Sequence, residues 1–189
     1  KKVHPRLPFF VLGTSMGGGV VMIAMTDKDK PDVDGIVLLA PAVWGRETMP
    51  WYQQLALWIG AHTFPSMTLT GKGLKIKPSD NIPMLIEFSK DPLVIKETRI
   101  GTIYGLTNLM DLALERAAQL STPALILYGI NDEVIPKAPT ALMLSRLPKV
   151  DKGTRRIGLY EKGYHMLLRD LQRNTVWNDI GAWITDGTS

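Results

Sequence analysis

The sequence predicts an α/β protein with a doubly wound, mostly parallel sheet and a long helical insertion. Strand-like and helix-like segments alternate along the 189 residues, which is the pattern of a parallel sheet covered by helices. The segment 35–40 is continuously apolar, as expected for a strand buried on both faces. The composition, 45% hydrophobic and 21% charged, is that of a globular chain long enough for a substantial core.

The individual elements follow from apolar periodicity and from the Gly and Pro residues that bound each segment. Strands are predicted at residues 8–12, 35–40, 124–128 and 156–160. Helices are predicted at residues 16–26, 108–119, 138–147 and 174–184. The last helix carries one apolar stripe, which we expect to pack against the sheet. This stripe consists of Val176, Trp177, Ile180, Trp183 and Ile184.

A long insertion separates the second predicted strand from the second half of the sheet. It covers residues 43–107 and is too long for a plain crossover between two strands. We predict that it forms a cap or lid, and that residues 1–42 and 108–189 form the core of the domain.

Aromatic side chains are frequent in this insertion. Pro50 is suited to begin a helix in which Trp51, Leu55 and Trp58 share one face. Trp44, Trp51 and Trp58 are candidate contacts for an apolar substrate, because each buried methylene contributes about 0.8 kcal/mol to binding. The alternative, that the aromatic side chains only pack the cap onto the sheet, stays open.

A Gly-x-Ser-x-Gly motif, Gly13-Thr14-Ser15-Met16-Gly17, lies between the first predicted strand and the first predicted helix. This layout is typical of a nucleophile elbow, a tight turn that holds its central serine in a strained backbone conformation. Gly13 and Gly17 are expected to let strand and helix approach each other, and Ser15 to lie beside the positive end of the helix. A Gly-rich turn needed only for packing is the alternative. A Walker-type phosphate loop is excluded because no Lys-Ser or Lys-Thr follows the glycines.

A serine hydroxyl becomes a nucleophile when a base takes its proton and a carboxylate orients that base. After a nucleophile elbow these partners follow in the order Asp or Glu, then His. Of the three histidines, His4 precedes the elbow and His62 lies in the aromatic insertion. We therefore predict that His165 is the base.

The carboxylate is predicted from its position after a strand. Asp132 closely follows the apolar strand 124–128, at the end where open α/β sheets place their chemistry. Its neighbour Glu133 is a weaker candidate, and a turn-forming or helix-capping role for Asp132 is the alternative. Other aspartates are expected at helix caps or on the surface: Asp91, Asp111, Asp151 and Asp170.

Three segments together resemble the α/β-hydrolase superfamily. They are Gly13 to Gly18, the run Gly129-x-x-Asp132-x-Val134-x-Pro136, and Gly163-Tyr164-His165. The length of the insertion and the sequence of residues 91–111 are most similar to monoacylglycerol lipases and lysophospholipase-like serine hydrolases. The resemblance implies a hydrolase fold with a cap, a catalytic triad of the serine, aspartate and histidine named above, and an acyl-enzyme intermediate.

The resemblance also raises the question of the oxyanion hole. The backbone N–H of Met16, the residue after the nucleophile, is the expected first donor. In the family a loop before the elbow strand supplies the second, and only a few residues precede that strand here. We therefore expect the second donor to come from outside this chain. On this expectation, the 189 residues are the C-terminal part of a longer hydrolase or one of two chains. The unpaired apolar edge of the elbow strand leads to the same expectation.

Charge and composition argue against several classes of protein. The net charge of +4 comes from dispersed basic residues, such as Lys72-Lys75-Lys77 and Arg155-Arg156, without the basic and aromatic pattern of a nucleic-acid surface. The absence of Cys removes disulfides, thiol catalysis and the usual zinc ligands. No segment has the apolar length of a membrane span. We expect no metal or organic cofactor, no nucleic-acid partner, and a cytoplasmic location or a peripheral contact with a membrane.

These observations predict a serine ester hydrolase, a carboxylesterase or lipase, whose partner is a small-molecule or lipid ester. Monoacylglycerol-like and lysophospholipid-like acyl esters are the expected substrates. Acyl transfer or perhydrolysis by the same three residues is one alternative. A non-catalytic ligand receptor on a hydrolase fold is the other.

Overall fold

The computed structural model describes residues 7–71, 73–151 and 153–186. His4 and Lys72, which entered the sequence analysis, lie outside these ranges. In the described ranges the main sheet is four-stranded and entirely parallel, with the strand order β1-β2-β5-β6. Its strands are β1 (Phe10–Thr14), β2 (Gly35–Leu39), β5 (Ala124–Gly129) and β6 (Arg155–Tyr160). The predicted parallel α/β architecture is confirmed, and the carboxyl ends of all these strands meet along one edge of the sheet.

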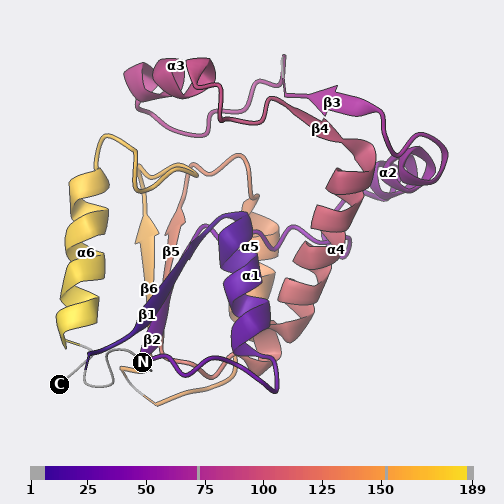
Figure 1. The fold of residues 1–189 in the computed structure, drawn as a ribbon. Helices are drawn as coiled ribbons and strands as arrows, with labels where there is room; N and C mark the ends of the chain where they lie inside the picture. The colour runs from indigo at the N-terminus through magenta and orange to yellow at the C-terminus, as the bar shows by residue number, and fades with distance from the viewer. Residues whose placement is uncertain (1–6, 72, 152, 187–189) are drawn as a thin grey trace.

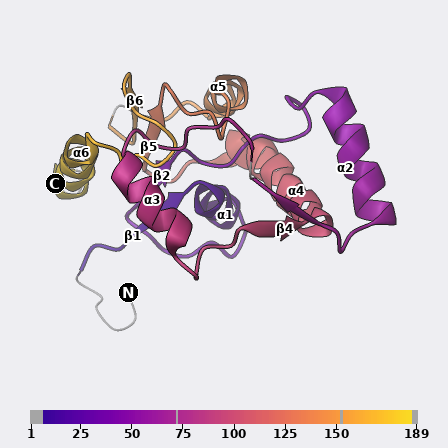
Figure 2. The ribbon, with the colours of Figure 1, turned by 90° about the horizontal axis from the view of Figure 1, so that it is seen from above.

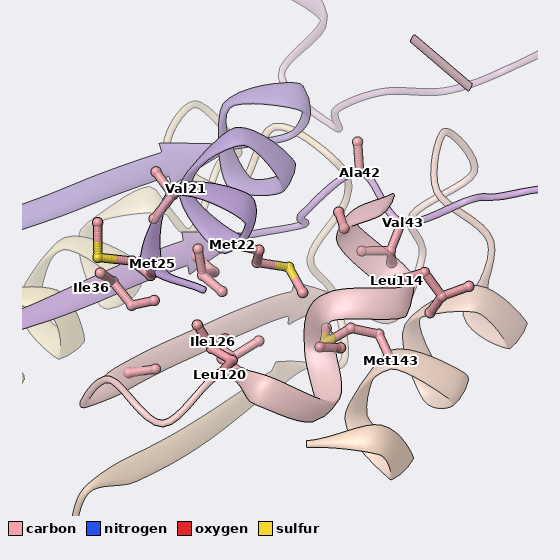
Figure 3. Close-up of a cluster of buried hydrophobic side chains, with 14 of the residues drawn as sticks. Val21, Met22, Met25, Ile36, Ala42, Val43, Leu114, Leu120, Ile126 and Met143 are labelled. Atoms are coloured by element: carbon pink, nitrogen blue, oxygen red, sulfur yellow. The ribbon is translucent and has the colours of Figure 1, made fainter. Parts of the chain in front are cut away.

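Helices cover both faces of this sheet, as Figure 1 shows. One face carries α1 (Met16–Met25), α4 (Ile100–Arg116) and α5 (Lys137–Arg146), while α6 (Arg173–Asp186) covers the other. Adjacent residues of a strand point to opposite faces, so β2 contributes to two cores. Its Ile36 packs on the α1 side, in the cluster drawn in Figure 3, and its Val37 on the α6 side.

A further set of elements extends from above the carboxyl ends of the strands, where α3 (Ile82–Lys90) lies, to the side of α4, where α2 (Trp51–Thr63) lies (Figures 1 and 2). It also includes β3 (Thr68–Thr70) and β4 (Glu97–Arg99). The strands β3 and β4 pair antiparallel in a small second sheet. Pro50 directly precedes α2, as predicted, whereas α3 and the small sheet were not anticipated. We refer to this set as the cap.

Most predicted boundaries lie within two residues of those in the structure. The elbow strand runs over Phe10–Thr14 instead of residues 8–12, because its pairing with β2 extends to Thr14. The helix predicted at 108–119 begins earlier, at Ile100, and ends in a 3-10 turn at Ala117–Gln119. The predicted edge of the cap at 107/108 therefore falls inside α4, where Gly, Thr and Ile residues weaken the local helix signal.

Candidate active site

Ser15 occupies a strained turn between β1 and α1. Its φ and ψ angles are 51° and −120°, and residues with a side chain rarely adopt such a positive φ. The backbone around it fixes this conformation: Ser15 N–H donates to Leu39 O at 2.9 Å, and Ser15 O accepts from Ala42 N–H at 2.8 Å. Strain of this kind costs about 1–3 kcal/mol and is concentrated at functional sites. The geometry is that of the predicted elbow.

The glycines of the elbow do not act quite as expected. A Cβ atom on Gly13 would lie 2.5 Å from Gly17 O, and one on Gly18 would lie 2.9 Å from Pro41 Cα. A Cβ on Gly17 would have no neighbour within 4 Å among the described residues. The prediction for Gly13 is confirmed, but the residue that gives the helix room is Gly18 and not Gly17. The reason is Pro41, which follows β2 and packs against the first turn of α1.

The three predicted side chains form one chain of hydrogen bonds. His165 Nε2 lies 2.9 Å from Ser15 Oγ, and His165 Nδ1 lies 2.8 Å from Asp132 Oδ2. The Asp132 side chain is fully buried and that of His165 is 11% exposed. The serine side chain does not cap the helix that it precedes, so it is available to the imidazole.

Asp132 is held in place by its own loop. Its Oδ1 atom accepts from the backbone N–H groups of Val134 and Ile135 at 2.8 and 2.9 Å, which leaves Oδ2 for the imidazole. The hydroxyl of Tyr128, at the end of β5, donates to Ile135 O at 2.8 Å. Burial, and next the charge of Asp132, raise the pKa of Tyr128 to about 12. The carboxylate is therefore fixed by contacts that the imidazole does not supply.

The loops that carry Asp132 and His165 touch at two glycines. A Cβ on Gly129 would lie 2.5 Å from the backbone of Gly163, so neither loop could approach as closely with a larger residue at 129. Asn131 N–H donates to Gly163 O at 2.9 Å and joins the loops directly. Glu133, the weaker candidate for the carboxylate, is turned to the cap, where it accepts from Lys77 N–H at 2.7 Å.

A pocket of about 500 Å³ opens at Ser15 and His165. Its walls are mostly apolar and come from the elbow, the cap and the segment after the histidine. The lining residues are Thr14, Ser15, Pro78, Phe88, His165, Met166, Leu168 and Arg169. This volume lies within the range of about 300–1,000 Å³ that is usual for small-molecule sites.

The three tryptophans predicted to contact substrate do not line this pocket. Trp51 and Trp58 lie on α2 with 74% and 53% of their surface exposed. Trp58 stacks on His62, with ring centroids 4.5 Å apart. Trp44 is half-buried and packs against the core on the α1 side. Their role in binding substrate stays a prediction.

Phe88 and Pro78, which line the pocket, were not singled out from the sequence. Phe88 lies on α3, and that helix carried a readable signal: Asn81 is its N-cap and accepts from Met84 N–H, and a proline follows in the first turn. Recognising α3 from the sequence would have placed Phe88 in the cap. It would not have shown that this side chain lies near the serine.

One of the other aspartates was misassigned. Asp91 is the C-cap of α3 and Asp151 is exposed, as expected, and Asp111 is half-buried beside Arg46. Asp170 was expected at a cap or on the surface, but it is only 1% exposed. Burial raises the pKa of its carboxyl above the usual range, while hydrogen bonds from the Ser79 hydroxyl and the Tyr164 N–H act in the opposite direction.

Within the described ranges, no three histidine, aspartate or glutamate side chains gather as a metal site would require. No helix in the same part of the chain combines the length and apolar character of a membrane span.

Comparison with known proteins identifies the family. The model of the serine aminopeptidase S33 family matches residues 1–172. The monoacylglycerol lipase of Mycolicibacterium smegmatis is 29% identical over 185 residues, which cover 96% of this chain and 63% of the relative. The human monoglyceride lipase is 27% identical over 195 residues, which cover 100% of this chain and 62% of the relative. The chain thus spans less than two thirds of the length of these relatives.

Solved structures agree with the sequence relatives. A monoacylglycerol lipase from Paleococcus ferrophilus aligns with a TM-score of 0.76 and 23% identity, over 94% of this chain and 68% of its own. A soluble variant of the Saccharomyces cerevisiae monoglyceride lipase, in complex with a substrate analogue, aligns with a TM-score of 0.77 and 21% identity, over 97% of this chain and 64% of its own. At these identities the likeness establishes the α/β-hydrolase fold. This chain belongs to the serine aminopeptidase S33 family of α/β-hydrolases, in which it is similar to monoacylglycerol lipases.

Proposed function

We propose that this chain carries the nucleophile, base and carboxylate of a serine hydrolase that cleaves monoacylglycerol-like or lysophospholipid-like acyl esters. The observation that carries the proposal is the hydrogen-bonded series Ser15–His165–Asp132 at the mouth of an apolar pocket. The names of the similar lipases support monoacylglycerol-like esters among these substrates.

Acylation begins with proton transfer inside this series. The Nδ1–H group of His165 donates to the carboxylate of Asp132, which leaves Nε2 as the acceptor for the Ser15 hydroxyl proton. Ser15 Oγ bonds to the ester carbonyl carbon while Nε2 takes that proton, and Asp132 stabilises the imidazolium. The oxyanion accepts a hydrogen bond from Met16 N–H, one of the first amides of α1 that have no partner within the helix. The second oxyanion donor stays a prediction.

The intermediate then collapses to products. The bond between the carbonyl carbon and the alcohol oxygen breaks, and Nε2 gives its proton to that oxygen. In the second half-reaction, a water molecule attacks the acyl carbon while Nε2 takes its proton. The fatty acid leaves as Ser15 Oγ recovers this proton, so the enzyme is unchanged.

The walls of the pocket suit the acyl chain of the substrate. Phe88, Met166 and Leu168 offer apolar walls beside Ser15, which suits an alkyl chain better than a polar group. Since a buried methylene contributes about 0.8 kcal/mol, kcat/KM should rise about fourfold with each added methylene until the pocket is full.

We also propose that the cap contacts a lipid surface, where such substrates reside. Five large apolar or aromatic residues on α2 are exposed: Trp51, Tyr52, Leu55, Trp58 and Ile59. Tryptophan and tyrosine favour the interface between lipid and water. Co-sedimentation with phosphatidylcholine vesicles should fall when Trp51 and Trp58 are both replaced by alanine. Equal binding of the wild type and this variant would contradict the contact.

The proposal is tested by turnover of full-length protein on a series of soluble esters with increasing acyl length, together with a monoacylglycerol and a lysophospholipid. Ser15→Ala should abolish hydrolysis of all of them, because the acyl-enzyme has no other attachment point. Turnover that persists in Ser15→Ala would remove the serine from this role.

The same experiment separates the alternatives. An acyltransferase would convert the substrate to a new ester when an alcohol acceptor is added, and a perhydrolase would yield a peracid with hydrogen peroxide. A receptor on a hydrolase fold would bind these esters without converting them to a fatty acid, a new ester or a peracid.

A further inference from the structure

Residues 77–81 cross from the cap to both loops of the candidate site, and we call this segment the brace. Lys77 N–H donates to Glu133 Oε2 at 2.7 Å, beside Asp132. Met166 N–H donates to Pro78 O at 2.9 Å, beside His165. The brace leads directly into α3, which carries Phe88 of the pocket. It therefore joins the cap to the parts of the chain that hold the imidazole and its carboxylate.

Asp170 lies at the centre of these contacts and uses both of its carboxylate oxygens. The Ser79 hydroxyl donates to Oδ1 at 2.6 Å, and the Tyr164 N–H donates to Oδ2 at 2.8 Å. Asp170 is 1% exposed and Ser79 is fully buried. One side chain thus binds the brace and, through the backbone N–H of Tyr164, the residue before His165, also the histidine loop.

Burying the Asp170 carboxylate is unfavourable in free energy. A buried ionised carboxylate loses its hydration, and an apolar residue of similar volume is often equally or more stabilising. The raised pKa of Asp170 reflects this burial. A buried acid that makes specific contacts to the backbone beside a reactive imidazole is better explained by the position that it imposes than by the stability that it adds.

The position matters because His165 has to meet two partners at once. Its two ring nitrogens lie within hydrogen-bond distance of Ser15 and Asp132. The peptide between Gly163 and Tyr164, one residue before His165, is held at both of its polar groups. Asp170 accepts from its N–H, and Asn131 N–H donates to its carbonyl oxygen, Gly163 O. A shift of about 1 Å at a reacting group can cost about a hundredfold in rate.

We propose that Asp170 is a positioning residue, which fixes the His165 loop through the Tyr164 N–H and links it to the cap through Ser79. The expected effect of Asp170 on rate rests on the proposed function. The expected effect of Asp170 on the position of the His165 loop does not. Asp170 does not touch the substrate pocket, so its loss should lower kcat and leave KM nearly unchanged.

Three variants test the inference in the full-length protein. Asp170→Ala removes both hydrogen bonds and should slow the reaction of Ser15 with a fluorophosphonate by about a hundredfold. Asp170→Asn can still accept from Tyr164 N–H and donate to Ser79 Oγ, so it should stay within about tenfold of the wild type. Ser79→Ala keeps the Tyr164 contact and should give an intermediate loss. Asp91→Ala, which removes an exposed carboxylate that also accepts a backbone N–H in the cap, is the matched control and should not change the rate.

A second measurement is independent of catalysis. Hydrogen exchange at the Tyr164 amide should be faster in Asp170→Ala and near the wild-type rate in Asp170→Asn. If the alanine variant does not fold, the asparagine variant still decides, because the inference requires its Tyr164 amide to stay protected. Unchanged protection in a folded Asp170→Ala variant, or lost protection in Asp170→Asn, would overturn the inference. A wild type that neither hydrolyses esters nor reacts with the fluorophosphonate would instead refute the proposed function, and the exchange result would still apply to Asp170.

Discussion

Replacing Gly13 by alanine tests the geometry of the elbow through stability. The new methyl carbon would lie 2.5, 2.7 and 2.8 Å from Gly17 O, Gly17 C and Gly18 Cα, where ordinary contacts begin at 3.4 Å. All three atoms belong to backbone that is held between β1 and α1, so no side-chain rotation can relieve the overlap. Overpacking usually costs 1–3 kcal/mol, and contacts with a fixed backbone place this substitution near about 3 kcal/mol. For a chain of this size that corresponds to a fall in Tm of about 6–12 °C.

The assay is thermal and denaturant unfolding followed by circular dichroism, with Gly17→Ala as the matched control. The control lies in the same turn, has open space around its Cβ position, and should leave stability unchanged or raise it by about 0.5–1 kcal/mol, since alanine is the better helix former. A Gly13→Ala protein that melts within about 1 °C of the wild type would refute the reasoning. So would a control that is destabilised as much as Gly13→Ala.

Three further predictions concern the site and its support. Asp132→Asn should lower kcat on soluble esters by about 10⁴-fold, because an amide no longer selects the imidazole tautomer that activates serine, and a loss below about tenfold would contradict its role. Phe88→Ala should flatten the dependence of kcat/KM on acyl length, whereas Trp58→Ala should preserve it; the reverse result would place the acyl chain on α2. The unfolding free energy of the wild type should fall as pH rises from about 10 to about 12, since folded Tyr128 keeps a proton that the unfolded chain releases. Tyr128→Phe should lack this part of the fall and lose about 1–3 kcal/mol at neutral pH through the unpaired Ile135 carbonyl; parallel pH curves would contradict the assignment.

The parts of the structure that the sequence predicted are those with local signals. The elbow lies within five residues, and the apolar strand before Asp132 is continuous in sequence. The aspartate and histidine were then identified from the order in which they follow a nucleophile elbow, and the loops of a parallel sheet that carry them meet at one edge. These signals do not depend on which distant residues pack against them.

The parts that were missed depend on distant partners. Strands β3 and β4 have three residues each and exist only because they pair with each other, with Leu69 opposite Thr98 at the centre of the pairing. The buried Asp170 is paired with Ser79, 91 residues earlier. The crowded glycine at position 18 follows from the placement of Pro41. No pattern in the neighbourhood of Asp170 or Gly18 shows that these contacts form.

Covalent labelling tests the central claim, a nucleophilic serine activated by the neighbouring imidazole, most directly. Folded full-length protein is treated with a fluorophosphonate, digested, and mapped by mass spectrometry, beside Ser15→Ala and a heat-unfolded sample. We predict one added phosphonyl group per chain on the peptide that contains Ser15, and none in either control. A folded wild type that stays unlabelled, or a label that persists in Ser15→Ala, would contradict the account.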